Sequence, residues 1–256
     1  MELTGRSSKP WYEGQSLKRF SHFWTSRNTP DQLIIDQIIP NNISIFIAYL
    51  SHRIGLTANH LSVGSGIFAI GAFLSAISLP ADQFSFAVMT IFVFSALSFL
   101  LDCADGQLAN ATNTASKFGE FLDKGVDVAS FLLCFGGFFG YLYRHFAAIG
   151  DAKLADTALL IGFLFLLAHS ARFFAWQSFA KSYTGLQSQT KDRLAFVILK
   201  NLGDHVVSLF SMFLSLVSPD LMFLLFGVQA AVHTGAYVRY FIRAYRISVG
   251  DRNSAR

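Results

Sequence analysis

Residues 85–101 read SFAVMTIFVFSALSFLL and contain no charged side chain. Residues 221–238, LMFLLFGVQAAVHTGAYV, form a second uncharged run. About 20 consecutive apolar residues are enough for a helix to cross a bilayer. The whole 256-residue chain fits this interpretation, because 53% of its residues are hydrophobic and only 14% are charged, whereas soluble domains carry about 25% charged residues. The sequence therefore predicts an integral membrane protein.

Outward from these two runs, six hydrophobic segments can be recognised, so we expect an all-α, polytopic membrane protein with six transmembrane helices. The segments cover residues 60–79, 84–108, 119–143, 155–177, 195–217 and 220–243. Three regions follow along the chain. They are an N-terminal cytoplasmic or interfacial segment at 1–56, a six-helix membrane domain at 57–246 and a cytoplasmic C-terminal tail at 247–256.

The N-terminal segment has the pattern of a helix that lies in the lipid headgroup region. Leu17, Phe20 and Trp24 fall on one helical face, and Lys and Arg residues are available to the polar side. Aromatic and basic residues mixed in this way are typical of interfacial helices. Residues 31–54 include an apolar stretch that is too short to span a bilayer, and we expect further interfacial structure there.

Positive charge is distributed unequally between the two sides of the expected bundle. Fourteen Lys and Arg residues fall before residue 57, in the 178–194 connection or at the C-terminal end, whereas the opposite side has Arg144 and Lys153. Because Lys and Arg favour cytoplasmic loops, both termini are expected in the cytoplasm. The 109–118 connection, and any site beside it, then faces the cytoplasm as well. In a bacterium the membrane would be the inner membrane.

Four aspartates lie where the second and third spans meet. Residues 101–110 read LDCADGQLAN, and residues 118–127 read FGEFLDKGVD. Asp102 and Asp105 are three residues apart, and Asp123 and Asp127 are four apart, so each pair shares a helical face. The short link lets the two helices run antiparallel. The four carboxylates are therefore expected to converge at one membrane depth.

Carboxylates at the end of a membrane span need compensation. Each costs about 2.5–3.5 kcal/mol at a helix centre on insertion scales, and only Lys124 is close in sequence. Oxygen ligands with this much negative charge suit Mg²⁺ or Mn²⁺. Small residues flank the aspartates: Gly119 is on the stripe of Asp123 and Asp127, and Gly106 and Ala109 lie near Asp105. A diphosphate that bridges two cations fits such a cleft.

The motif resembles the signature of a known family. The pattern D-x2-D-G-x2-A-R-x8-G-x3-D-x3-D is similar to that of the CDP-alcohol phosphotransferases, membrane enzymes of phospholipid synthesis with six spans. Seven positions match: Asp102, Asp105, Gly106, Ala109, Gly119, Asp123 and Asp127. The chain departs from the pattern at Asn110, where the family usually has Arg. Lys117 or Lys124 could supply the missing positive charge.

The resemblance implies a reaction and roles for these residues. A phosphatidyl or phospho-alcohol group passes from a CDP-linked donor, with CDP-diacylglycerol favoured, to an alcohol acceptor, and CMP is released. The four aspartates would hold two divalent ions, and Asp127 would also be the general base. The CDP part of the donor would lie against Gly106, Ala109, Asn110, Lys117 and Gly119. The resemblance also implies a homodimer.

Other polar residues in the spans allow more than one interpretation. Arg172 lies three residues after His169 and could either bind an acceptor or lipid phosphate or extend to the interface. Lys200 and Asp204, four residues apart, are interpreted as an ion pair, and His233 as a packing residue. Two cysteines, Cys103 and Cys134, fall in apolar stretches and are interpreted as buried thiols.

Two alternative functions use the same acidic cluster. A membrane prenyltransferase also binds diphosphate through aspartates and Mg²⁺, but its two aspartate-rich motifs lie on well-separated helices. A cation transporter would hold the carboxylates near the bilayer midplane and show an inverted repeat. No nucleic acid partner is expected, since the formal net charge is only +4. Release of CMP from a CDP-linked donor would distinguish the three functions.

Overall fold

The computed structural model describes residues 20–26, 40–182 and 205–254, and every regular element within these ranges is an α-helix. The helices are α1 (Phe20–Ser26), α3 (Pro40–Arg53), α4 (Ala58–Ser78), α5 (Phe84–Thr112), α6 (Lys117–Ala148), α7 (Ala152–Ser182), α9 (His205–Leu214) and α10 (Pro219–Ser254). The prediction of an all-α membrane fold is confirmed.

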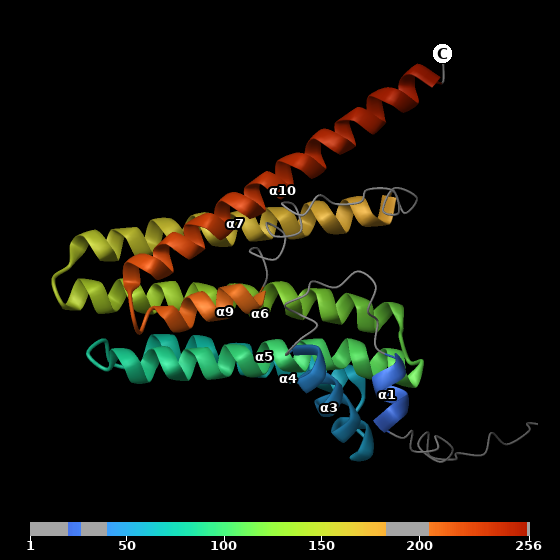
Figure 1. Ribbon diagram of the computed structural model, residues 1–256, viewed down its shortest axis with the longest axis horizontal. Coiled ribbons are helices and arrows are strands. Elements are labelled where there is room, and N and C mark those ends of the chain that lie inside the picture. Colours follow the sequence, from blue (N-terminus) through green and yellow to red (C-terminus); the bar gives the residue numbers. More distant parts are fainter. Residues whose placement is uncertain (1–19, 27–39, 183–204, 255–256) are drawn as a thin grey trace, which may run out of the picture.

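Five of the described helices, α4, α5, α6, α7 and α10, are long and apolar enough to cross a membrane. The expected span at 195–217 is represented by the shorter apolar helix α9, and residues 195–204 lie outside the described ranges. Figure 1 shows α4 to α7 and α9 side by side in a bundle, from which α10 departs at an angle. The apolar part of α10 ends at Arg246, and the helix continues through the expected tail to Ser254.

Helix α4 packs along both α5 and α6 through small side chains. Ala69, Ala72 and Ala76 are all buried on α4. On α6, a Cβ atom added to Gly137 would lie 3.2 Å from the Cβ of Ala76 and 3.3 Å from the Cα of Phe73. Small residues allow this close approach between membrane helices. The two helices that carry the aspartates are thus held against a common partner.

Phenylalanine fills the space among α6, α7 and α10. The ring centroids of Phe139 and Phe226 are 4.9 Å apart, and those of Phe165 and Phe226 are also 4.9 Å apart. A Cβ atom added to Gly162 would lie 2.6 Å from the ring of Phe139, so this ring rests directly on the backbone of α7. Interlocked aromatic rings therefore join the two halves of the bundle.

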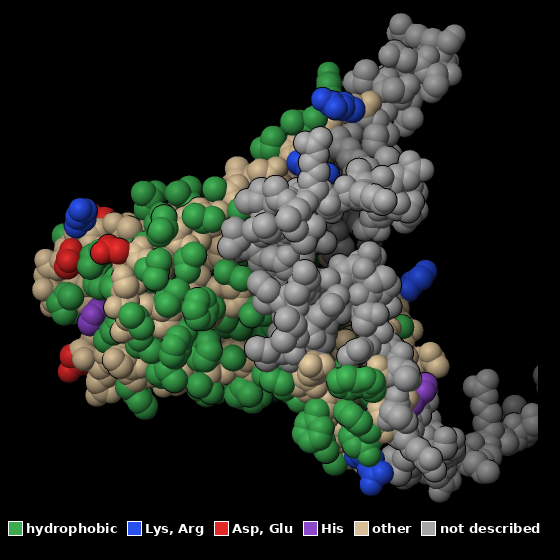
Figure 2. Space-filling model, in the orientation of Figure 1, with side chains coloured by type: hydrophobic (Ala, Val, Ile, Leu, Met, Phe, Trp, Pro, Cys, Tyr) green, Lys and Arg blue, Asp and Glu red, His purple; other side chains and the backbone are tan. Residues whose placement is uncertain are grey.

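The outer surface of the bundle is apolar. Figure 2 shows hydrophobic side chains over its middle, and acidic and basic side chains at the end that carries the α6–α7 turn. Large exposed side chains include Ile67, Ile70, Leu74, Leu160, Phe163 and Leu167. A continuous apolar surface of this kind suits contact with lipid rather than water, in agreement with the prediction of an integral membrane protein.

A turn of four residues, 113–116, joins α5 to α6. Asn113 ends α5 with a left-handed φ of 55°, a conformation that Asn tolerates better than most residues. Ser116 begins α6, because its hydroxyl oxygen accepts a hydrogen bond of 3.0 Å from the backbone N–H of Gly119. The helices therefore reverse direction sharply, and residues near the end of α5 face residues near the start of α6.

Arg144 is clamped to the C-terminal end of α4, at the opposite end of the bundle. Its guanidinium donates hydrogen bonds to the carbonyl oxygens of Ala76 and Ile77, both at 2.8 Å, and of Leu79 at 3.0 Å. The hydroxyl of Tyr141 donates to the carbonyl oxygen of Pro80 at 3.2 Å. The residue that the sequence places in a loop is thus part of α6, where it satisfies carbonyls that a helix end leaves unpaired.

The described N-terminal helices pack at the end of the bundle that carries the α5–α6 turn (Figure 1). Phe20 and Trp24 share a face of α1 and are 38% and 40% exposed. Phe23, which the sequence pattern does not single out, is buried against Tyr49 of α3. The ring Nε2 of His22 also lies 2.9 Å from the carbonyl oxygen of Ala111. Leu17 lies outside the described residues.

Candidate active site

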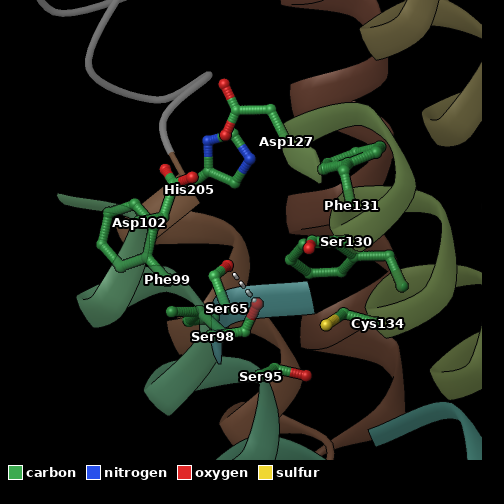
Figure 3. Close-up of a pocket in the computed structure, with 12 residues that line it drawn as sticks. Ser65, Ser95, Ser98, Phe99, Asp102, Asp127, Ser130, Phe131, Cys134 and His205 are labelled. Atoms are coloured by element: carbon green, nitrogen blue, oxygen red, sulfur yellow. Dashed lines mark hydrogen bonds between the residues drawn. The ribbon is translucent and has the colours of Figure 1, made fainter. Parts of the chain in front are cut away.

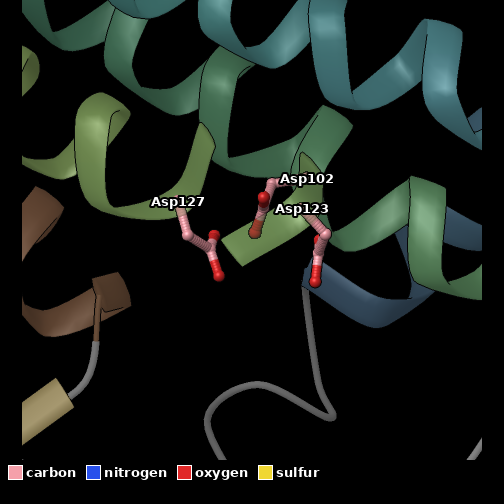
Figure 4. A group of neighbouring side chains, drawn as sticks. All are labelled: Asp102, Asp123 and Asp127. Carbon is pink, nitrogen blue, oxygen red and sulfur yellow. The ribbon is translucent and has the colours of Figure 1, made fainter. Parts of the chain in front are cut away.

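Three carboxylates come together where α5 and α6 face each other. Asp102 projects from α5, and Asp123 and Asp127 project from adjacent turns of α6 (Figure 4). One carboxylate oxygen of each lies within 4.8 Å of the others, and all three side chains are half-buried. The four-residue spacing on α6 and the sharp turn after α5 explain this arrangement.

The chemistry of these donors fits divalent cations. The Oδ1 atom of Asp102 is buried and has no hydrogen-bond partner in the part of the chain that the structure describes. Within the same residues, no Lys or Arg forms an ion pair with the three carboxylates, and Lys124 pairs with Glu120 one turn away on α6. An unpaired buried carboxylate oxygen is unfavourable unless a cation or a donor reaches it. A cluster of hard oxygen ligands suits Mg²⁺ or Mn²⁺.

Asp105 is held apart from this group. Its carboxylate is buried, only 4% exposed, and accepts a hydrogen bond from the hydroxyl of Ser62 on α4. Asp105 is three residues after Asp102, so its side chain points about 60° away from that of Asp102 around the helix axis. This offset directs Asp105 toward α4. The structure therefore brings three of the four predicted ligands together and places the fourth one turn along α5 in a different contact.

The small residues of the motif have different surroundings. Gly106 is exposed, and no atom lies within 4 Å of a Cβ added to it. At Gly119 an added Cβ would meet Ser116 Oγ at 3.2 Å and Asn59 Oδ1 at 3.3 Å, so its size serves the packing of the first turn of α6. Ala109 is half-buried, and Asn110 and Lys117 are exposed on either side of the turn. Open space next to the aspartates thus lies at Gly106.

A small cavity with both polar and apolar walls extends from the aspartates into the bundle (Figure 3). Asp102 and Asp127 lie at one end, and four serines line it: Ser65, Ser95, Ser98 and Ser130. The volume of the cavity is about 30 Å³, which is enough for about two groups of the size of a water molecule. No Lys or Arg is among the described residues that line it. Within this part of the chain, serine hydroxyls and the two carboxylates thus face apolar side chains such as Phe99 and Phe135 across the cavity.

Two of these serines have hydroxyls without a hydrogen-bond partner among the described residues. Serine in a helix commonly donates to the carbonyl four residues earlier, as Ser75 does to Gly71 at 2.7 Å. The hydroxyls of Ser95 and Ser130 are buried and have no hydrogen-bond partner in the described part of the chain. Ser65 and Ser98 bond to each other across α4 and α5 at 3.1 Å. Unpaired buried hydroxyls are unfavourable, so this wall is suited to a polar guest.

A second cavity lies on the other side of Asp127. It shares Asp127, Phe131 and His205 with the first and is also lined by His169. The ring of His205 stacks on Phe99 with centroids 5.6 Å apart. These histidines and serines were not predicted as site residues. The spacing of Ser95 and Ser98 inside an uncharged run was the available signal, whereas nothing in the sequence links either histidine to Asp127.

The remaining predictions fall inside the bundle or outside the described residues. Arg172 Nη1 lies 2.8 Å from Nδ1 of His233, which is completely buried and so packs as expected. Lys200 and Asp204 lie outside the described ranges. Neither cysteine forms a disulfide; Cys134 is buried, and Cys103 is only half-buried.

Comparison with known proteins gives two findings. The family model described as CDP-alcohol phosphatidyltransferase matches residues 55–234. This region begins just before α4 and ends near the middle of α10. A protein of Aquifex aeolicus (strain VF5), described as uncharacterized, is 28% identical over 190 residues, which cover 74% of this chain and 70% of that protein. The matched region contains the four aspartates of the motif and the described lining of both cavities.

Proposed function

Since the chain belongs to the CDP-alcohol phosphatidyltransferase family, we propose that it transfers the phosphatidyl group of CDP-diacylglycerol to an alcohol and releases CMP. The chain is a membrane transferase of phosphorus-containing groups by this membership. The observation that carries the proposal is a group of three carboxylates, Asp102, Asp123 and Asp127, at the mouth of a hydroxyl-lined cavity.

Asp102, Asp123 and Asp127 are the proposed ligands of two divalent cations, Mg²⁺ or Mn²⁺, and the oxygen of Asp105 that is not bonded to Ser62 is the proposed fourth ligand. The unpaired Oδ1 of Asp102 supports this assignment. When bound, the cations would neutralise the diphosphate of the donor and stabilise the leaving phosphate oxygen. The nucleotide is proposed to lie over Gly106, where the surface is open. Asn110 and Lys117 flank that surface.

Asp127 is the proposed general base. It is half-buried and lines both cavities, so an alcohol in either one meets its carboxylate. The carboxylate takes the proton of the alcohol hydroxyl, and the alcohol oxygen forms a bond to the phosphorus of the phosphatidyl group. The bond between that phosphorus and the oxygen of CMP breaks, and CMP leaves with the electron pair.

The first cavity is the proposed site for the reacting end of the acceptor. Ser95 and Ser130 can each donate and accept a hydrogen bond, as an alcohol hydroxyl requires. Among the described residues, no Lys or Arg on the lining would pair with a phosphate or carboxylate group. The acceptor is therefore proposed to present an uncharged hydroxymethyl-sized end, which matches the small volume.

The distribution of Lys and Arg in the sequence supports a cytoplasmic active site. The turn at residues 113–116, which lies beside the aspartates, is then cytoplasmic, and a water-soluble product such as CMP leaves directly into that compartment. A homodimer is proposed from the family resemblance.

The purified full-length protein tests the proposal in lipid vesicles. CDP-diacylglycerol is supplied with Mg²⁺ and a panel of acceptors in which glycerol is matched with glycerol 3-phosphate, and CMP release is measured. We expect acceptor-dependent CMP release, and none from Asp127→Asn. A second assay supplies a CDP-linked headgroup as the donor and diacylglycerol as the acceptor, and so tests transfer of a phospho-alcohol group. The absence of CMP release with every pair of substrates would contradict the proposal.

A further inference from the structure

Three side chains form a hydrogen-bonded row between α7 and α10, which pack against each other. Arg172 Nη1 lies 2.8 Å from Nδ1 of His233. Nε2 of His233 lies 3.4 Å from Nδ1 of His169. His233 is completely buried, and the ring of His169 stacks on Phe131 with centroids 3.6 Å apart and planes 13° apart. Both rings therefore have fixed orientations.

The direction of each hydrogen bond follows from the guanidinium. An Arg side chain has only donors, so Nδ1 of His233 must carry a lone pair and accept from Arg172. The imidazole of His233 is consequently neutral, and its proton is on Nε2. This N–H donates to Nδ1 of His169, which must also carry a lone pair. The proton of neutral His169 is therefore on Nε2.

Nε2 of His169 is the end of the row. Its N–H has no hydrogen-bond partner among the described residues, and His169 lines the second cavity together with Asp127. Nδ1 is turned to His233, so Nε2 is the ring nitrogen left for the cavity. A packing histidine would need no fixed donor there. The row instead presents a single N–H to the cavity that Asp127 also lines.

We propose that His169 is a substrate-binding residue that donates a hydrogen bond from Nε2 to a substrate oxygen beside Asp127. Arg172 and His233 are positioning residues. They fix the tautomer of His169, and neither is among the residues that line the cavity. The inference rests on the proposed function. The ligand chemistry is an oxygen lone pair, from either the acceptor hydroxyl or a phosphate of the CDP-linked donor.

Steady-state kinetics with CDP-diacylglycerol and the best acceptor of the panel distinguish the two sources. His169→Phe keeps a ring that can stack on Phe131 but removes the donor, and His169→Gln keeps a donor. We expect His169→Phe to raise the KM of one substrate about tenfold, with a smaller change for His169→Gln. A raised KM for the acceptor identifies its hydroxyl, and a raised KM for the donor identifies its phosphate. Unchanged KM values for both would overturn the proposal.

The role of His233 is tested by two variants. Gln at this position can accept from Arg172 through its carbonyl oxygen and donate to His169 through its amide, whereas Leu can do neither. We expect His233→Gln to retain the wild-type KM values and His233→Leu to reproduce the KM change of His169→Phe. If the Leu variant does not fold, His233→Gln alone tests the role of His233. A loss of substrate affinity in this folded variant would contradict the positioning of His169 by the hydrogen-bonded row.

Nitrogen-15 NMR of histidine-labelled protein in detergent micelles gives a readout that needs no turnover. His169 and His233, assigned from the variants above, should both show a protonated Nε2 and an unprotonated Nδ1. A protonated Nδ1 on His169 would overturn the inference even in an active enzyme. Failure of the wild type to release CMP would instead sink the proposed function. In that case CDP with Mg²⁺ is the probe, and the absence of any shift of the His169 Nε2 signal also overturns the inference.

Discussion

The hydroxyl of Ser62 on α4 donates a hydrogen bond to the buried carboxylate of Asp105 on α5. This contact joins side chains 43 positions apart in sequence and accounts for the separation of Asp105 from the other three aspartates. Ser62 itself is 3% exposed, so water cannot easily replace its hydroxyl. The bond therefore connects the packing of α4 with the chemistry of the site.

Ser62→Ala is expected to destabilise the protein by about 1–3 kcal/mol, because a buried carboxylate loses its donor. Thermal unfolding in detergent measures the change. Ser75→Ala is the matched control on the same helix, since the hydroxyl of Ser75 bonds only to the carbonyl of Gly71, and it should leave the unfolding midpoint almost unchanged. Equal effects of the two substitutions would show that Asp105 does not depend on Ser62.

Removal of divalent cations should abolish CMP release. The reason is that Asp102, Asp123 and Asp127 lie within 4.8 Å of one another without a paired Lys or Arg among the described residues. We expect Mg²⁺ or Mn²⁺, added after treatment with a chelator, to restore the rate. Undiminished activity in excess chelator would rule out the two-cation assignment.

Asp123→Asn is expected to abolish turnover while the protein remains folded. The substitution removes one anionic ligand but keeps the size of a half-buried side chain near the start of α6. CMP release and the elution of the protein as a single species from gel filtration are the two measurements. Glu120→Gln, three residues away and exposed, is the control and should retain activity. An Asp123→Asn protein that aggregates, with no intact inactive form, would point to a structural role for Asp123.

Ser130→Ala should weaken acceptor binding and leave the KM for the donor unchanged, because the unpaired hydroxyl of Ser130 faces the first cavity. About a threefold to tenfold rise in the acceptor KM corresponds to one neutral hydrogen bond. Ser211→Ala serves as the control, since the buried hydroxyl of Ser211 is bonded to the carbonyl of Val207 at 2.8 Å. A donor KM that rises instead would place the nucleotide, and not the acceptor, in this cavity.

The sequence was sufficient to predict the helical membrane fold and the pairing of Asp102 with Asp123 and Asp127. Both depend on local rules, namely apolar length, helical spacing and a short link between two helices. The expected boundaries of the third span, 119–143, extend in the structure to Lys117–Ala148, because polar residues at a helix end continue the helix outside the apolar run.

Contacts between residues distant in the chain could not be predicted. The spacing of Asp105 permits it to join the other carboxylates, and only the packing of α4 turns it to Ser62. In the same way, Arg172 and His233 are 61 positions apart, so their hydrogen bond depends on how α7 meets α10. Local periodicity determines the face on which a side chain lies, but tertiary packing chooses its partner.

The clamp of Arg144 on the carbonyls at the end of α4 has a mechanical consequence. It fixes the α4–α5 hairpin to α6 at the end remote from the aspartates, whereas the turn at residues 113–116 joins α5 to α6 at the other end. Asp102 lies 18 residues from the start of α5, which is about 27 Å along a helix. A tilt of about 3° around the clamped end would shift this carboxylate by about 1.4 Å, so a small change in helix packing would alter the spacing of the ligands without any break in the backbone.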